Sequence, residues 1–264
     1  MKILKLYPSI DTPSRYNYQI NYGIWDEIKG DSIKLENFKI SKLDNYDVIF
    51  LPMRKRWGKQ INLFNQIKQH RIKTIMFDND CYVGEFSDSF YSGVDFIFYR
   101  IFDKKNNKPK NGMWLPWSID TNKYEAKYGG SGVSFNSTIH PIYPHRREIS
   151  RIVKNTKYVG LKYIKHLQDS SAAIHASSFE MTHGKVIEFA SCGTQIISNR
   201  TEHMNYYFPD ELIIYFKDVN ELKQIIKNFK PNVEIQKELR HIVETKHDNK
   251  IRAKEVLQKI EEIL

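Results

Sequence analysis

The chain has 264 residues, with 41% hydrophobic and 27% charged, and its 41 Lys and Arg against 31 Asp and Glu give a formal net charge of +10. This composition suits one large or two small domains with a hydrophobic core. No apolar run approaches the ~18–20 residues that span a bilayer, and the first residues turn polar too early for a signal peptide. We therefore expect no transmembrane segment. Two cysteines, Cys81 and Cys192, make no disulfide framework, so we expect a reduced, cytoplasmic location.

The first half of the chain alternates short apolar runs with segments of helical spacing. We expect strands at 2–7, 46–51, 73–77, 94–99 and 112–115, and helices at 16–28 and 58–70. This alternation is typical of an α/β fold with a doubly wound parallel sheet.

Two polar clusters follow predicted strands of this half. Arg54, Lys55, Arg56 and Trp57 come after the strand at 46–51, and Asp78 and Asp80 come after the strand at 73–77. Ligands of open α/β sheets bind outside the carboxyl ends of the strands. Cations beside a Trp suit phosphate contact with stacking, although a solvated loop explains the first cluster equally well.

A second alternating run follows a linker at 124–131. We expect strands at 133–136, 171–175, 195–198 and 212–215. Helices are expected at 144–154, 161–167, 203–208, 219–229, 231–245 and 249–264, whereas 157–160 reads as extended.

The stretch at 175–198 contains the residues most suited to binding a substrate. Glu180 and Glu188 are separated by seven residues, Gly184 begins a short helix, and Cys192-Gly193 ends it. The free N–H groups at a helix start suit a phosphate, and nearby carboxylates suit sugar or ribose hydroxyls. The pattern therefore indicates a pocket for a sugar nucleotide.

Several motifs resemble the GT-B glycosyltransferases, in particular the branch with spore-maturation-protein-like transferases. The resemblance covers about residues 112–230. It is carried by E-x7-E at 180–188, by the pattern K-x-x-E-F-x-S-C-G at 185–193, by the LPWSID segment at 115–120 and by the strand at 133–137, in which Asn136 replaces the usual glycine. It implies a compact GT-B fold of two Rossmann-like domains facing across a cleft. An acceptor domain would occupy 1–115, a sugar-nucleotide domain 121–245, and a closing helix 246–264.

The resemblance also implies residue roles. Glu188 would bind the ribose hydroxyls of the donor, and Glu180 would lie at the reacting carbon, where a carboxylate stabilises oxocarbenium-like charge. Arg146, Arg147 and Lys185 are candidates for the donor diphosphate. Thr182, His183 and Gly184 complete the candidate donor set; the family often has its glycine one position nearer Glu180, so the Met181–His183 loop is set differently here. An ordinary loop histidine without a role in binding is an equally good interpretation of His183.

Asp78 and Asp80 need separate treatment, because a D-x-D pair binds manganese in the other large glycosyltransferase fold. GT-B enzymes usually work without a bound metal, so we expect neither metal nor cofactor beyond the nucleotide sugar. In the acceptor half, these aspartates suit a catalytic base or an acceptor contact, since a base must reach the acceptor hydroxyl. Simple capping of a following helix is the equal alternative.

We therefore expect transfer of a sugar from a nucleoside diphosphate, UDP by family habit, to a hydroxyl. The positive charge, with the basic segments 54–57 and 104–110, favours hydroxymethylated DNA bases as acceptor, as in phage-type DNA glycosyltransferases. One alternative is a transferase for a cell-surface polymer or its lipid-linked precursor, where the charge would hold anionic headgroups. Another is a non-catalytic nucleic-acid-binding protein on this scaffold. The charge could equally be a solvated lysine-rich surface.

Overall fold

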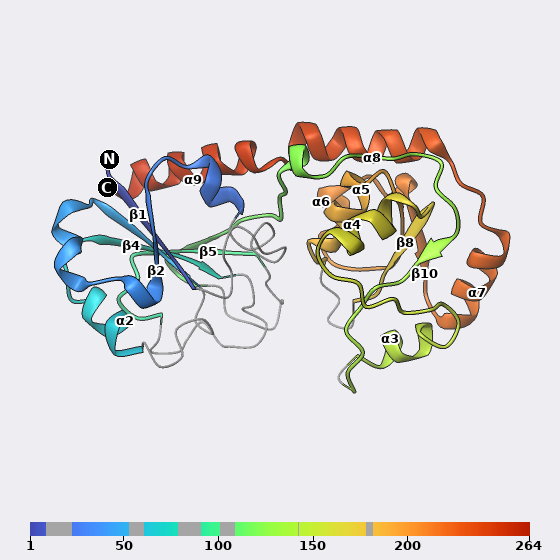
Figure 1. The fold of residues 1–264 in the computed structure, drawn as a ribbon, viewed down its shortest axis with the longest axis horizontal. Coiled ribbons are helices and arrows are strands. Elements are labelled where there is room, and N and C mark those ends of the chain that lie inside the picture. Colours follow the sequence, from blue (N-terminus) through green and yellow to red (C-terminus); the bar gives the residue numbers. More distant parts are fainter. Residues whose placement is uncertain (9–22, 53–60, 79–90, 101–108, 142, 178–181) are drawn as a thin grey trace. The chain divides into compact units, whose positions relative to one another are not determined.

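We describe the protein from a computed structural model of residues 1–264, which covers the chain except for residues 9–22, 53–60, 79–90, 101–108, 142 and 178–181. The chain divides into two compact units (Figure 1). The N-terminal unit contains Met1–Pro116 together with Arg252–Leu264, and the C-terminal unit contains Trp117–Ile251.

The N-terminal unit is built on a parallel sheet with the strand order β2-β1-β3-β4-β5-β6. Its strands are β1 (Ile3–Tyr7), β2 (Asp31–Lys34), β3 (Val48–Leu51), β4 (Lys73–Asp78), β5 (Phe96–Tyr99) and β6 (Gly112–Trp114). All five strands predicted for this half are present. The edge strand β2 was missed, because its sequence DSIK is short, polar and largely exposed.

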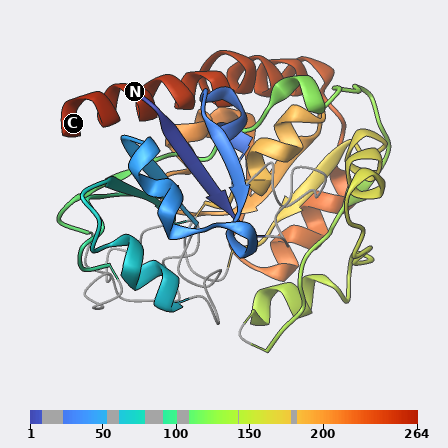
Figure 2. The ribbon, with the colours of Figure 1, turned by 60° about the vertical axis from the view of Figure 1, so that its left-hand side comes forward.

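Helices cover both faces of this sheet. Figures 1 and 2 show α2 (Ile61–Ile67) on one face and the last helix, α9 (Asn249–Ile263), along the other. Ala253, Val256 and Ile260 of α9 pack in the same core cluster as Ile3 and Val48 of the sheet. The end of the chain is therefore part of the N-terminal unit.

Aromatic rings fill the core beneath α9. The centroids of Phe50 and Phe77 are 5.1 Å apart, as are those of Phe77 and Phe98, and Trp25 lies 5.3 Å from Phe77. The three Phe rings come from adjacent strands and point to the same face, as the two-residue period of a strand requires, whereas Trp25 comes from the segment 23–27.

The helix predicted at 16–28 is wrong over its described part. Gly23–Glu27 forms a short 3-10 helix, η2, instead of an α-helix. The buried Lys5 of β1 donates to the carbonyls of Trp25 and Ile28, each at 2.8 Å, and burial lowers the pKa of Lys5. These carbonyls satisfy two of the three donors of the buried ammonium group.

The C-terminal unit contains a second parallel sheet with the order β10-β9-β8-β7. Its strands are β7 (Val133–Ser134), β8 (Ala172–His175), β9 (Gln195–Asn199) and β10 (Ile213–Phe216). Its helices are α3 (Pro144–Ile149), α4 (Leu161–Gln168), α5 (Lys185–Ser191), α6 (Met204–Tyr207), α7 (Val219–Asn228) and α8 (Val233–Lys246). Short 3-10 helices also occur in the described chain: η3 (Leu35–Asn37), η4 (Ile40–Asn45), η8 (Thr121–Lys123) and η9 (Asp210–Leu212).

The helices of this unit also occupy two faces. Ile149 of α3 and Leu222 of α7 pack in one core cluster with Ile174 and Ile197 of the sheet. Helix α5 packs against α8 and against strands β8 and β9. Two doubly wound parallel sheets are therefore present, as the strand and helix pattern predicted.

Segment 157–160 is not simply extended. Lys157 and Gly160 both have positive φ, 50° and 59°, so the chain makes a shaped turn before α4. The α5 helix ends at Cys192, and Gly193 follows with φ 77°, a conformation that favours glycine. A Cβ on Gly193 would meet the carbonyl oxygen of Lys127 at 2.5 Å. Glycine at position 193 is thus required by both conformation and space.

Candidate functional site

The candidate site lies at the carboxyl end of β8, in the C-terminal unit. The chain leaves β8 at His175 and enters α5 at Lys185. Thr182 anchors the described end of this connection: its hydroxyl donates to the carbonyl of Glu202 at 2.6 Å and lies 2.8 Å from the hydroxyl of Thr201. The entry to α5 is thereby fixed to the segment that follows β9.

Two cations lie at this end of the sheet. Arg146 of α3 donates through Nε to the carbonyl of Ala176 at 2.8 Å and stacks on Tyr143, 4.1 Å from the ring centroid. Lys185, the first residue of α5, donates to the carbonyl of Asn136 at 2.5 Å. Burial, and then the positive charge of Arg146, lowers the pKa of Lys185 to about 8. An anion placed here would relieve the repulsion between the two cations.

Two histidines adjoin the cations but remain neutral. Burial and the nearby charges of Arg146 and Lys185 lower the pKa of His183 to about 4, and burial, followed by His183, lowers the pKa of His175 well below its usual value. The ring centroids of the two histidines are 5.8 Å apart. The positive charge of the cluster therefore resides on Arg146 and Lys185.

Hydrogen bonds fix the tautomer of His175. The hydroxyl of Ser198 donates to the carbonyl of Asn199 at 2.7 Å, so at the 2.8 Å contact between His175 Nδ1 and Ser198 Oγ the imidazole must donate. Its Nε2 is then a buried acceptor, and it has no partner among the described residues. His183 Nε2 lies 3.3 Å from the hydroxyl of Ser177.

Glu188 is buried, with 1% of its surface exposed. The hydroxyl of Tyr163 on α4 donates to its Oε2 at 3.2 Å, while Oε1 has no hydrogen-bond partner in the described part of the chain. Burial raises the pKa of Glu188 well above its usual value. A buried carboxyl group with one unsatisfied oxygen is costly in a folded protein unless something else uses that oxygen.

The structure separates the two arginines predicted together. Arg146 reaches the site, whereas Arg147 is exposed on the outer side of α3, as expected for adjacent residues on a helix. Gly184 is the N-cap residue of α5 and adopts an ordinary right-handed conformation.

The remaining candidates lie in the N-terminal unit or outside the described residues. Asp78 ends β4 in the N-terminal unit; it is buried, and the hydroxyl of Tyr91 donates to its Oδ2 at 2.5 Å. Glu180, Asp80 and the cluster at 54–57 lie outside the described residues.

Sequence reasoning missed the partners of these residues. Tyr163 lies within a predicted helix, but nothing in the pattern links it to Glu188, which is 25 positions away. Asn199 follows the strand predicted at 195–198 and was given no role. Its side chain forms two hydrogen bonds with the main chain of Ser177, both 2.9 Å long, and so shapes the exit from β8.

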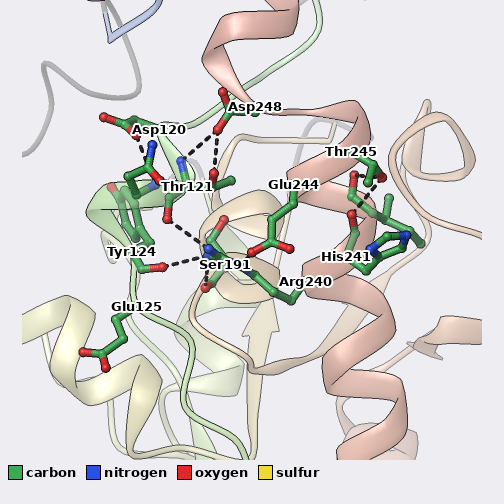
Figure 3. A network of polar contacts seen from close by, with 12 residues as sticks. Asp120, Thr121, Tyr124, Glu125, Ser191, Arg240, His241, Glu244, Thr245 and Asp248 are labelled. Carbon is green, nitrogen blue, oxygen red and sulfur yellow. Dashed lines mark hydrogen bonds and ion pairs between the residues drawn. The ribbon is translucent and has the colours of Figure 1, made fainter.

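A second polar network holds the other end of α5 (Figure 3). Arg240 of α8 donates to the carbonyls of Tyr124 and Ser191 at 2.7 Å and of Thr121 at 2.9 Å, and it pairs with Glu244 at 2.6 Å. Asp248 accepts from the main-chain N–H and the hydroxyl of Thr121, at 3.1 and 2.6 Å. Residues 121–124 are thereby tied to α8 and to the last turn of α5.

A pocket of about 420 Å³ lies at the carboxyl end of β9. Its lining residues are Arg200, Thr201, Glu202, His203, Met204, Asn205, Asp210 and Tyr215. Asp210 accepts from Arg200 at 3.1 Å and from Tyr215 at 2.7 Å. This wall of the pocket is polar and exposed to water.

Within the described residues, no group of three or more His, Cys, Asp or Glu is arranged to hold a metal ion. Among the same residues, no helix combines the length and the hydrophobicity that crossing a membrane requires.

Solved structures that are similar to this chain include glycosyltransferases. HepE of Anabaena, in complex with UDP and glucose, has a TM-score of 0.70 at 10% identity, with 99% of this chain and 100% of that chain covered. Sucrose-phosphate synthase of Thermosynechococcus elongatus has a TM-score of 0.67 at 10% identity, with coverages of 100% and 99%. The DNA-modifying enzyme beta-glucosyltransferase, solved with and without uridine diphosphoglucose, has a TM-score of 0.65 at 13% identity, with coverages of 98% and 99%.

The fold is therefore GT-B, which confirms the class predicted from the sequence motifs. Residues 121–258, more than half of the chain, match the glycosyl transferase-like family. The chain belongs to this family, and it is a glycosyltransferase. No curated protein sequence matches it.

Proposed function

We propose that the C-terminal unit binds a UDP-sugar at the carboxyl end of β8 and that the enzyme transfers the sugar without a metal ion. The observation that carries this proposal is the pair formed by Arg146 and Lys185. Both are held by main-chain carbonyls, at 2.8 and 2.5 Å, beside two neutral histidines. The leaving group of the reaction is a nucleoside diphosphate, whose growing negative charge such cations stabilise.

Glu188 is assigned to the ribose. Its Oε2 is occupied by Tyr163, so Oε1 is the oxygen available to accept from a ribose hydroxyl once the nucleotide is bound. UDP as the nucleotide is supported by the structures of HepE, solved with UDP and glucose, and of the DNA-modifying beta-glucosyltransferase, solved with uridine diphosphoglucose. Residues 121–245 would then form the donor domain, with Glu180 beside the reacting carbon.

The donor assignment is tested by calorimetric titration with UDP. Glu188→Ala is expected to weaken binding roughly 10–100-fold, the equivalent of one or two hydrogen bonds. Glu234→Ala is the matched control, because it removes a carboxylate whose side chain is 80% exposed on α8. Unchanged UDP affinity in a folded Glu188→Ala protein would reject the assignment.

For the acceptor, residues 1–115 are assigned, with Asp78 and Asp80 as candidate bases and residues 54–57 as candidate contacts. The first acceptor class is DNA with hydroxymethylated bases. It is supported by the net charge of +10 and by the similarity to the DNA-modifying beta-glucosyltransferase. Lys and Arg would bind the phosphates while the base is reached or flipped.

A second acceptor class is a lipid-linked precursor of a surface polymer. One specific observation favours it: an exposed apolar turn flanked by lysines at residues 157–165. The two classes are separated by incubating the enzyme with labelled UDP-sugars and either hydroxymethylated duplex DNA or a lipid extract. Label that stays with the donor in both reactions, with no hydrolysis, would contradict the proposed activity.

A further inference from the structure

The segment from Arg151 to Gln168 is unusual in charge. It contains Arg151, Lys154, Lys157, Lys162 and Lys165 and no acidic residue. All five basic residues are exposed. The segment leads from the end of α3 to the end of α4 within the C-terminal unit (Figure 1).

The middle of this segment exposes aliphatic side chains. Val159 is 79% exposed and Leu161 is 83% exposed, which are the highest values among the large hydrophobic residues described. Two neighbouring aliphatic residues that remain in water at the tip of a turn contribute nothing to the core. Such an apolar patch with a polar rim marks an interaction site.

The turn is preformed. Lys157 adopts a positive φ of 50°, which is uncommon for a residue with a side chain, and Gly160 follows at 59°. The side chain of Asn136 donates to the carbonyl of Tyr158 at 2.7 Å, and the Tyr158 ring packs edge-on against His166 with a centroid distance of 5.1 Å. The backbone is thus shaped so that Val159 and Leu161 project, while the partly exposed Tyr158 ring contacts His166.

We propose that residues 157–165 dock the enzyme on an anionic membrane surface, with Val159 and Leu161 inserted among the acyl chains and the surrounding lysines on the headgroups. Aliphatic burial and lysine attraction to anionic lipid act together at such a site. Nucleic acid is the less suitable occupant, because Tyr158, at 43% exposed, packs edge-on against His166, and the side chains that project furthest into water are aliphatic.

Binding to vesicles tests this proposal directly. We expect the protein to float with vesicles of phosphatidylcholine plus phosphatidylglycerol and not with phosphatidylcholine alone. The double variant Val159→Ser, Leu161→Ser is expected to lose roughly tenfold or more in vesicle affinity, since two aliphatic side chains no longer enter the hydrocarbon. Equal vesicle binding by this variant, or no vesicle binding by the wild type, would overturn the proposal.

The charge contribution has its own matched control. Lys162→Gln, Lys165→Gln should weaken binding to anionic vesicles strongly, whereas Lys223→Gln, Lys227→Gln on the exposed surface of α7 removes the same charge elsewhere and should have little effect. Equal losses in both pairs would show a nonspecific effect of net charge and refute the assigned site. Reduced duplex-DNA affinity in the first pair, without vesicle binding, would assign the segment to nucleic acid and also refute it.

Insertion is tested separately from adsorption. A Trp introduced as Val159→Trp should be quenched by brominated lipids in anionic vesicles, while Gln224→Trp on the exposed face of α7 should not. All of these variants should bind UDP as the wild type does, because none of the substituted positions belongs to the proposed donor site. A failure of the membrane proposal is therefore distinguishable from a failure of the donor assignment. Conversely, Glu188→Ala should keep its vesicle binding even where it loses UDP.

Discussion

Replacing Arg240 by alanine is expected to destabilise the C-terminal unit strongly. Its guanidinium is the shared donor for three main-chain carbonyls, at 2.7, 2.7 and 2.9 Å, in segments distant in sequence (Figure 3). The side chain is only 11% exposed, and two of the accepting residues, Tyr124 and Ser191, are at most 1% exposed. After truncation, water would reach these carbonyls only with difficulty.

The magnitude follows from these contacts. Hydrogen bonds to a charged group contribute about 1.5–3 kcal/mol each, and three that share one donor are not fully additive, so we expect a loss of about 4 kcal/mol in the free energy of unfolding. The pair with Glu244 adds little, because that carboxylate is 45% exposed and solvent screens it. For a unit of this size the loss corresponds to a decrease in Tm of roughly 15 °C.

Thermal and urea unfolding of three variants tests this estimate. Arg240→Lys should fall between the wild type and Arg240→Ala, because a single ammonium group cannot reproduce the planar fork of a guanidinium toward three acceptors. Glu244→Gln should stay within about 1 kcal/mol of the wild type. The reasoning is refuted if Arg240→Ala costs less than 1 kcal/mol or if the lysine variant is as stable as the wild type.

Three further outcomes follow from the site. Tyr163→Phe removes the donor to Glu188 and should weaken UDP binding several-fold by calorimetry, with a larger loss for UDP than for its 2′,3′-dideoxy analogue; equal losses would contradict a role through the ribose. UDP affinity should fall above about pH 8 as Lys185 loses its proton, and Lys185→Arg should abolish that fall; a wild-type profile that is flat to pH 10 would exclude it. Gly193→Ala should lower the free energy of unfolding by about 1–3 kcal/mol in urea titrations, and no loss would refute the argument from its φ of 77°.

Local pattern was sufficient to predict most of the fold. Parallel strands that are buried on both faces have continuous apolar sequences. Buried runs such as Val48–Leu51 and Ala172–His175 are of this kind, and they are short and bounded by turn residues. Strand β2 and the 3-10 helix η2 could not be found in this way. Their conformations depend on pairing with β1 and on the ammonium group of Lys5, and neither is encoded within the segments themselves.

The candidate site was predictable only in part. The motif at 185–193 made Lys185 and Glu188 candidates because their types and spacing are local. Tyr163 contacts Glu188 only through the tertiary packing of α4 on α5, and the separation of Arg146 from Arg147 depends on the orientation of α3. Contacts of this kind follow from the assembled fold and have no signature in the sequence.

The spacing within the α5 motif has a physical explanation. Helix α5 is buried from Val186 to Ser191, so the packing around the helix fixes the surroundings of each side chain there. Lys185 is at the helix start, where it reaches the carbonyl of Asn136, and Glu188 lies one turn further on, beneath Tyr163. Gly193 then lets the chain turn into β9 without a collision with Lys127.

This arrangement gives the proposed site its precision. A carboxyl group and an ammonium group on an exposed helix would each lose conformational freedom when a nucleotide binds. On a helix packed against β8, β9 and α8, that freedom has already been lost on folding. Burying Glu188 with an unsatisfied Oε1 lowers the stability of the free protein. A ligand hydroxyl that donates to this oxygen removes that penalty. Saturating UDP should therefore raise the Tm of the wild type by several degrees and that of Glu188→Ala by much less, as measured by differential scanning fluorimetry.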